Sequence, residues 1–151
     1  MNKGLVAEAS ITIHASVAKV WDALTRPEII KQYMFGTKVV SDWREGSSII
    51  WKGEWQGKKY EDKGVILKLQ PMRTLRYSHY SPLSGLPDTQ ENYHAVSIEL
   101  SSKGRQTLVS LTQDNNTNEQ ERQHSQDNWK MMLTTLRKLL ENSSDMNPSS
   151  R

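Results

Sequence analysis

Cysteine is missing from the 151 residues of this sequence. The chain therefore has no disulfide framework, no thiolate ligand for a metal and no thiol nucleophile. This composition fits a reducing compartment, so we expect a cytoplasmic protein. We expect no metal or other cofactor, because the four histidines form no His-x-His pair or short cluster with carboxylates that would supply three ligands.

Long apolar runs are missing as well. No window approaches about 18 apolar residues, and the stretch from Met1 to Ile13 lacks the continuous apolar core of a secretion signal. We predict a soluble protein that is not exported and has no membrane partner.

Neither sign of charge dominates the chain. Its 20 basic residues are scattered among 17 acidic ones, and Lys58-Lys59 and Arg137-Lys138 are the only adjacent basic pairs. Affinity for a phosphate backbone needs clustered positive charge, so we predict no nucleic-acid partner.

Apolar residues are few, at 35% of the chain, and a single Phe stands against five Trp and five Tyr. Most of the large side chains therefore carry a polar tip, which suits a cavity wall better than a dry interior. We expect a modest or incompletely filled core.

The first part of the sequence predicts one strand and two short helices. Residues Ala7 to Ile13 alternate between apolar and polar, as in a strand that is wet on one face. Ser16 is placed to cap a helix over Val17–Thr25, and Pro27 precedes a second short helix that ends near Tyr33.

The middle of the chain predicts strands separated by turn signals. Their short connections require antiparallel neighbours. The Pro-, Gly- and Ser-rich segment Ser81–Asp88 interrupts them as a surface loop that could gate a pocket. The predicted strands are Thr37–Ser41, Ser48–Glu54, Lys58–Gln70, Arg73–Tyr80, Asn92–Ser101 and Gln106–Asp114.

The last element is a helix from Asn118 to Glu141 whose two halves differ. Its first half is polar, and steps of three and four mark an apolar face only in its second half, at Trp129, Met132, Leu133, Leu136, Leu139 and Leu140. We predict an α+β fold in which a curved antiparallel sheet of six or seven strands grips this helix tightly near its end and loosely near its beginning. One domain would span residues 1–142, and residues 143–151 would form a disordered tail.

Several motifs resemble the START-like (SRPBCC) helix-grip superfamily, and its branch named after the activator of the heat-shock protein 90 ATPase. The resemblance rests on Ile11-Thr12-Ile13, the run Val20 to Glu28, Gly46, the run Gly64 to Pro71, and Asn128-Trp129. It implies a seven-stranded antiparallel sheet around the long helix with a cavity between them. It does not imply one activity, because such folds host ligand carriers, cyclases and chaperone partners.

Strand parity offers an independent route to the residues of that cavity. Leu75, Tyr77 and His79 share one face, and His94 shares parity with the apolar residues of the next strand. Parity also places Trp51 inward, and Val65, Leu67 and Leu69 on the core side of the neighbouring strand. The candidate ligand-binding residues are Trp51, Tyr77, His79 and His94, with Tyr33 and Trp55 added as aromatics near the expected cavity.

Structural roles compete with these assignments. The two histidines could simply be satisfied by backbone carbonyls or a tyrosine hydroxyl, and Trp21 and Trp129 sit in helical apolar stripes typical of core anchors. The polar first turns of the last helix, from Glu119 to Ser125, are predicted to be solvent-exposed surface. Asp62, with Glu54 or Glu61, would form an acid/base pair only if buried. No nucleophile motif is present, so we name no catalytic residue.

Three hypotheses follow. The first is a binder of a small apolar or amphipathic molecule in a cavity between sheet and helix. The second is an interaction module that assists a chaperone ATPase, and the third is a cyclase or hydrolase that uses a cavity histidine. A homodimer stays open as a further alternative.

Overall fold

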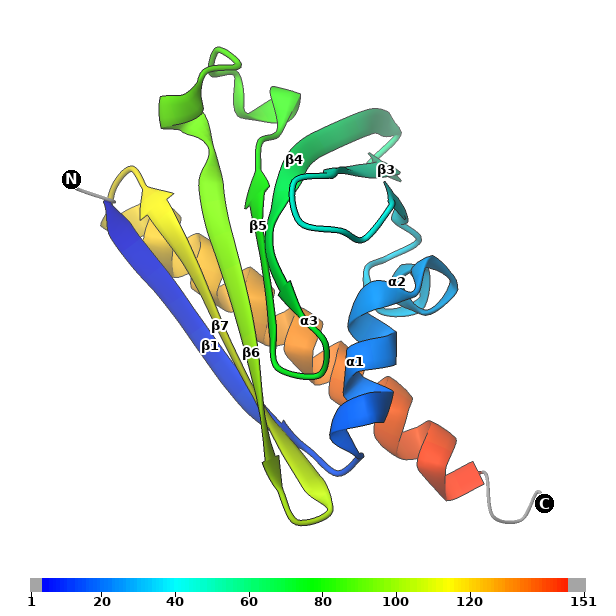
Figure 1. Cartoon of the computed structure of the whole chain (residues 1–151). Coiled ribbons are helices and arrows are strands. Elements are labelled where there is room, and N and C mark those ends of the chain that lie inside the picture. The colour runs from blue at the N-terminus through cyan, green and yellow to red at the C-terminus, as the bar shows by residue number, and fades with distance from the viewer. Residues whose placement is uncertain (1–3, 147–151) are drawn as a thin grey trace.

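The computed structural model describes residues 4–146 and contains one curved antiparallel sheet with helices on one of its faces (Figure 1). Seven strands follow the order β1-β7-β6-β5-β4-β3-β2. The predicted α+β helix-grip fold is confirmed. The strands are β1 (Leu5–Ile13), β2 (Lys38–Ser41), β3 (Ser48–Trp55), β4 (Lys58–Gln70), β5 (Thr74–His79), β6 (His94–Lys103) and β7 (Gln106–Asn116).

The helices are α1 (Val17–Thr25), α2 (Pro27–Tyr33) and α3 (Glu119–Met146). The Ser16 side chain accepts a hydrogen bond from the Lys19 amide, as predicted for the cap of α1. Helix α3 continues five residues past its predicted end at Glu141, and residues 147–151 of the predicted tail lie outside the described part of the chain. No described helix is long and apolar enough to cross a membrane.

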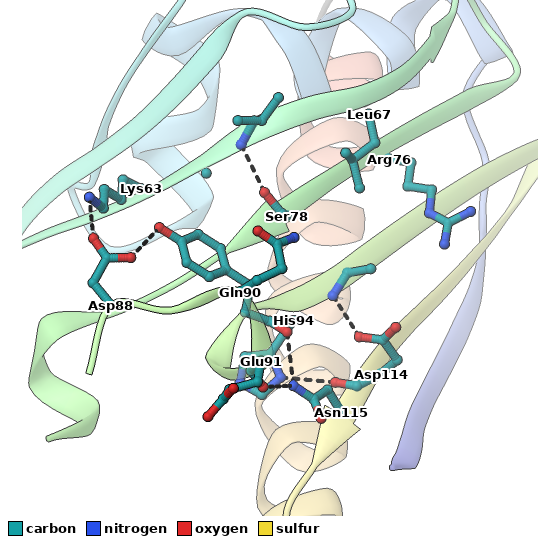
Figure 2. Close-up of a pocket in the computed structure, with 14 residues that line it drawn as sticks. Lys63, Leu67, Arg76, Ser78, Asp88, Gln90, Glu91, His94, Asp114 and Asn115 are labelled. Carbon is teal, nitrogen blue, oxygen red and sulfur yellow. Dashed lines mark hydrogen bonds and ion pairs between the residues drawn. The ribbon is translucent and has the colours of Figure 1, made fainter. Parts of the chain in front are cut away.

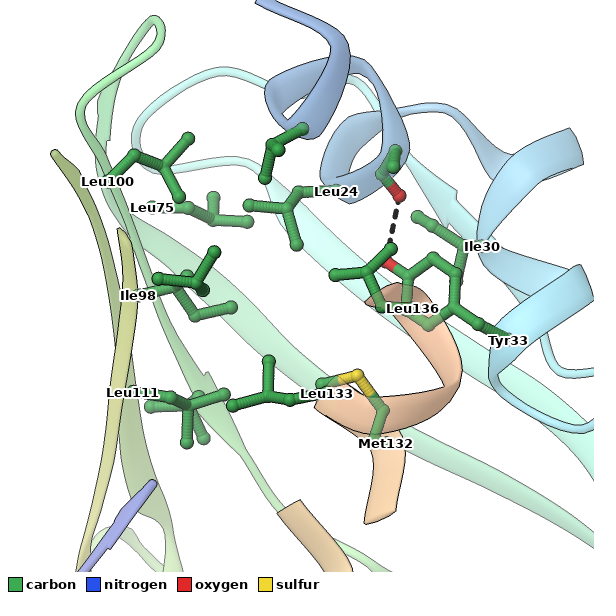
Figure 3. Close-up of a cluster of buried hydrophobic side chains, with 14 of the residues drawn as sticks. Leu24, Ile30, Tyr33, Leu75, Ile98, Leu100, Leu111, Met132, Leu133 and Leu136 are labelled. Carbon is green, nitrogen blue, oxygen red and sulfur yellow. Dashed lines mark hydrogen bonds between the residues drawn. The ribbon is translucent and has the colours of Figure 1, made fainter. Parts of the chain in front are cut away.

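Helix α3 crosses the concave face of the sheet and is attached to β1 near both ends. The amide of Glu8 donates to Gln126 Oε1 at 3.3 Å, and the amide of His14 donates to Glu141 Oε2 at 2.8 Å. Between these points the second half of the helix is packed into the core. Met132, Leu133 and Leu136 meet side chains from β5, β6 and β7 on one side and from α1 and α2 on the other (Figure 3).

The predicted facing of β4 is partly wrong. Val65 and Leu67 are exposed on the outer face, whereas Ile66 is 1% exposed and fills the core. The register shifts between Ile66 and Lys68, so Leu67 is an extra residue in a β-bulge and Leu69 returns to the core side as predicted. The bulge changes the parity of the strand, and the residues before it face opposite to the prediction.

Gly64 of β4 packs directly against the backbone of Ser78 in β5. A Cβ atom at this position would come within 1.7 Å of the Ser78 carbonyl oxygen, so only glycine permits this approach. The same segment brings Asp62 to the inner face, next to His79 of β5.

Two short 3₁₀ turns, η1 (Pro82–Ser84) and η2 (Gln90–Asn92), form the connection from β5 to β6. The predicted surface loop Ser81–Asp88 is part of this connection. It is fixed to β4 by Asp88, which forms an ion pair with Lys63 and accepts a hydrogen bond from the Tyr93 hydroxyl at 2.7 Å.

Candidate functional site

A cavity of about 230 Å³ lies between the sheet and the first half of α3. The loose grip predicted for this half of the helix leaves this space. Its lining is aromatic and polar and consists of Met34, Thr37, Trp51, Tyr60, Asp62, Tyr77, His79, His94, Gln113, Glu121, His124, Ser125 and Trp129.

His79 and Asp62 form a pair at the wall of the cavity. His79 Nε2 is 2.9 Å from Asp62 Oδ2, and the two side chains are 29% and 15% exposed. Asp62 Oδ1 is buried and has no hydrogen-bond partner among the described residues. Because an ionised carboxylate can only accept, the pair fixes Nε2 of His79 as the protonated nitrogen and leaves Nδ1 as an acceptor in the neutral ring.

His94 has the opposite arrangement. Its Nδ1 lies 2.9 Å from the carbonyl oxygen of Asp114, which can only accept, so Nδ1 carries the proton and Nε2 is the free acceptor. The rings of His79 and His94 are 6.5 Å apart. The cavity is therefore bordered by two imidazoles that each use one nitrogen for positioning and keep the other available.

Aromatic rings hold the histidines in place. Trp51 lies edge-on to His79 and tilted against Tyr77, with ring centroids 5.0 Å apart in both pairs. Trp129 donates from Nε1 to Gln113 Oε1 at 2.6 Å. This wall combines apolar ring faces with oriented polar atoms, which is the composition of a small-molecule site.

Burial raises the pKa of the Tyr77 hydroxyl well above its usual range. It also raises the pKa of Tyr33, with a smaller contribution from Tyr77. Both phenols are neutral at physiological pH. Neither is a phenolate base, and Tyr33 uses its hydroxyl as a hydrogen-bond donor.

The structure brings four of the six predicted site residues to this cavity: Trp51, Tyr77, His79 and His94. Tyr33 lies deeper, beside a neighbouring apolar void of about 30 Å³, and its hydroxyl donates to the Ala23 carbonyl at 2.7 Å. That bond ties α2 to α1, so Tyr33 has a place in the core. The side chain of Trp55 lies outside the described residues.

Other cavity residues were not predicted. Glu121, His124 and Ser125 line the cavity mouth although the polar helix start was interpreted as surface, and Asp62 was considered only with Glu54 or Glu61 as partner. The β4 bulge explains the omission of Asp62, because uncorrected parity points its side chain outward. Trp21 and Trp129 pack against the core as predicted, and Trp129 also borders the cavity.

The acidic and histidine side chains of residues 4–146 include no group of three placed to hold a metal ion. The His79–Asp62 pair with His94 instead offers hydrogen bonding and proton transfer.

Comparisons with known proteins agree with this architecture. The family model for the Activator of Hsp90 ATPase homolog 1-like protein matches residues 14–141. No curated protein matches the chain.

Three solved structures illustrate the likeness. The solution structure of ChR145 from Cytophaga hutchinsonii is 56% identical, covers 96% of this chain and 99% of its own, and has a TM-score of 0.84. CalU16 from Micromonospora echinospora is 25% identical over 87% of this chain and 81% of its own, with a TM-score of 0.67. The Aha1 dimer from Colwellia psychrerythraea is 24% identical over 91% of this chain and 96% of its own, with a TM-score of 0.70, and shows the same fold. The chain belongs to the Activator of Hsp90 ATPase homolog 1-like family.

Proposed function

We propose that this protein binds a compact amphipathic molecule, bearing at least one hydroxyl group, in the cavity between the sheet and the first half of α3. The observation that carries the proposal is the pair of imidazoles, His79 and His94, each held by an oxygen acceptor and bordering the same aromatic-walled space.

The size of the cavity favours a small ligand. Pockets for drug-sized molecules measure roughly 300–1,000 Å³, and this cavity of about 230 Å³ is smaller. Trp51, Tyr77 and Trp129 supply ring faces for an apolar body, which favours one aromatic ring or a short branched chain over a long lipid.

The polar atoms select for a donor on the ligand. His79 Nδ1 and His94 Nε2 are acceptors in the neutral rings, and Asp62 Oδ1 is an acceptor without a partner in the described chain. A ligand hydroxyl can donate to one of them, whereas an ether of the same shape cannot.

Calorimetric titration with 4-ethylphenol and 4-ethylanisole tests this preference, because the two molecules differ only in the hydroxyl proton and its methyl replacement. We expect saturable binding of the phenol, and binding of the ether that is weaker by about 10-fold, which corresponds to roughly one hydrogen bond.

Variants locate the binding. His79→Ala and His94→Ala should each lower the affinity for 4-ethylphenol. Lys103→Ala, at the exposed end of β6, should leave that affinity unchanged. Equal affinity for phenol and ether, or unchanged affinity in both histidine variants, would refute the proposal.

Acid–base catalysis on the bound molecule is a second candidate, favoured by the contact of 2.9 Å between His79 and Asp62. A carboxylate behind an imidazole orients it and stabilises its protonated form, as required of a general base. Any turnover found with a hydroxylated substrate should be lost in His79→Ala and strongly reduced in Asp62→Asn. Retention of turnover in both variants would remove this candidate.

Assistance of a chaperone ATPase, and assembly as a homodimer, stay as alternatives that rest on the family alone. A change in the ATPase rate of a chaperone from the same cell on addition of this protein would support the first. Sedimentation measured over a range of concentrations addresses the second.

A further inference from the structure

The outer face of the sheet carries a second, larger depression that the proposed function does not use. It has a volume of about 860 Å³ and lies beneath the β5–β6 connection (Figure 2). We call it the outer groove and define it by Val65 and Leu67 of β4, Arg76 and Ser78 of β5, and Tyr93 and Asp114 near the ends of β6 and β7.

Arg76 is the distinctive residue of the outer groove. Its Nε atom is buried and has no hydrogen-bond partner in the described chain, and no carboxylate of residues 4–146 lies within ion-pair distance of its guanidinium. Because Nε is closed to solvent, the donors that Arg76 can offer to a ligand are its terminal nitrogens, for which the described residues supply no carboxylate.

A second cation, Lys68, lies beside Arg76 but is not among the residues that line the outer groove. Lys68 is paired directly with Arg76 across β4 and β5, which places two like charges opposite each other on one face. Like charges in this position repel each other modestly, and an anion beside them would relieve the repulsion.

Three carboxylates also line the outer groove, those of Asp88, Glu91 and Asp114, and they restrict an anion to the side of Arg76. Lys63 and Asp88 are bound to each other at the end near the loop. The carboxylate of Asp114 accepts from the Ala95 amide at 2.6 Å. Glu91 also borders the outer groove, on the loop side, so an anionic ligand would direct its charge away from the loop and toward Arg76.

Apolar surface lies directly beside the cations. The bulge in β4 turns Leu67 outward next to Arg76 (Figure 2), and Val65 and Leu67 are 39% and 46% exposed. An arginine with an unused donor beside two exposed aliphatic side chains matches a molecule with a carboxylate at one end and an apolar body.

We propose that the outer groove binds a small organic carboxylate with an aliphatic body. The carboxylate would accept from the two terminal nitrogens of Arg76, with Lys68 alongside. The aliphatic body would cover Val65 and Leu67. His94 borders both the outer groove and the cavity beneath α3, but Arg76, Val65 and Leu67 line the outer groove alone. The occupant of the cavity is expected to donate a hydrogen bond, whereas the occupant of the outer groove would accept one.

Nuclear magnetic resonance titration with hexanoate, 1-hexanol and inorganic phosphate separates the contributions of charge and chain. We expect hexanoate to shift the amides of Val65, Leu67 and Ser78 in a saturable manner. Hexanol and phosphate should each bind more weakly by about 10-fold or more, since hexanol lacks the negative charge and phosphate lacks the aliphatic chain. Equal binding of hexanol, or shifts confined to the cavity residues, would overturn the proposal.

Variants complete the test. Arg76→Gln should lower the affinity for hexanoate by about 10-fold or more. Arg76→Lys should lower it less, because lysine keeps the positive charge and loses only the bidentate geometry of the guanidinium. Lys103→Gln serves as a matched surface control, and His79→Ala, which impairs the cavity, should leave hexanoate binding unchanged. If Arg76→Gln retains a dispersed amide spectrum and full affinity, the assignment to Arg76 is wrong. If Arg76→Gln fails to fold, Arg76→Lys and Leu67→Ser decide, and unaltered affinity in both refutes the site.

Discussion

At the scale of single residues, His79 and His94 are positioned through opposite ring nitrogens. His79 uses Nε2 toward Asp62, and His94 uses Nδ1 toward the Asp114 carbonyl. Each ring therefore borders the cavity and keeps one nitrogen that its positioning contact does not use.

This arrangement predicts the tautomers of the two neutral rings. Nuclear magnetic resonance spectra that correlate the ring nitrogens with the carbon-bound ring protons report the tautomer. In alkaline buffer they should show Nε2–H for His79 and Nδ1–H for His94. In Asp62→Asn the His79 ring loses its charged acceptor, so a mixture of tautomers is expected there, while His94 keeps its form. The same tautomer in both wild-type rings would contradict the geometry.

Gly64 sets the close passage of β4 over β5, and its replacement should be costly. In Gly64→Ala the new Cβ would overlap the Ser78 carbonyl, which belongs to the backbone and cannot rotate away. We expect the free energy of unfolding to fall by about 3 kcal/mol or more, at the upper end for overpacking. Urea denaturation measures this loss.

Gly53→Ala is the matched control. Its Cβ would meet the ring end of Tyr60, a side chain that can move, so a smaller loss is expected. Equal losses for the two variants would show that the backbone contact at Gly64 is not the cause.

At the scale of elements, α3 combines a packed half with an open half. Leu136 lies on the core face of the packed half and is fully buried, whereas Met131, five residues earlier, is on the outward face of the helix and is 52% exposed. Leu136→Ala should lower the free energy of unfolding by about 2–5 kcal/mol, and Met131→Ala should change it by less than about 0.5 kcal/mol. Chemical denaturation of the two variants checks the difference, and similar values would mean that the helix is not gripped as described.

The β5–β6 connection is held to the sheet by Asp88. Hydrogen bonds from Lys63 and Tyr93 lower the pKa of the Asp88 carboxyl below its ordinary value of 3.8. Since the folded pKa is the lower one, the contribution is fully present above about pH 4 and is lost as the pH falls through the folded pKa. The link therefore persists at neutral pH.

Removing this charge should loosen the connection without acid. In Asp88→Asn at neutral pH, we expect faster hydrogen exchange for the amides of Asn92 and Tyr93, which are hydrogen-bonded within the loop. The amide of Ile98 in the middle of β6 should be unaffected. Unchanged exchange at Asn92 and Tyr93 would mean that Asp88 does not hold the loop.

At the scale of the whole molecule, the sequence was sufficient for the fold and insufficient for the site. Periodicity predicted the first strand, the first helix and the long last helix, while Pro, Gly and other turn signals delimited the short second helix and the middle strands. Short connections then required antiparallel pairing. The inward side chains of β5 and β6 followed from parity, since those strands pair without interruption.

The site could not be obtained in the same way. The contact between Asp62 and His79 depends on the register of β4 and β5 and on a bulge that has no sequence signal of its own. Tyr33 was placed near the cavity from its position after α2, but its facing is set by the hydroxyl contact with α1. Side-chain contacts between segments that are distant in the sequence, such as these two, leave no local pattern from which they could be predicted.

The central claim is that the space beneath the first half of α3 accepts a small hydroxylated molecule. A titration of the indole signals with 4-ethylphenol tests it most directly, because Trp51 and Trp129 border the cavity and Trp21 does not. We predict saturable shifts of the Trp51 and Trp129 indole protons with no change at Trp21. Indole signals that stay constant, or that all move together without saturation, would contradict the claim.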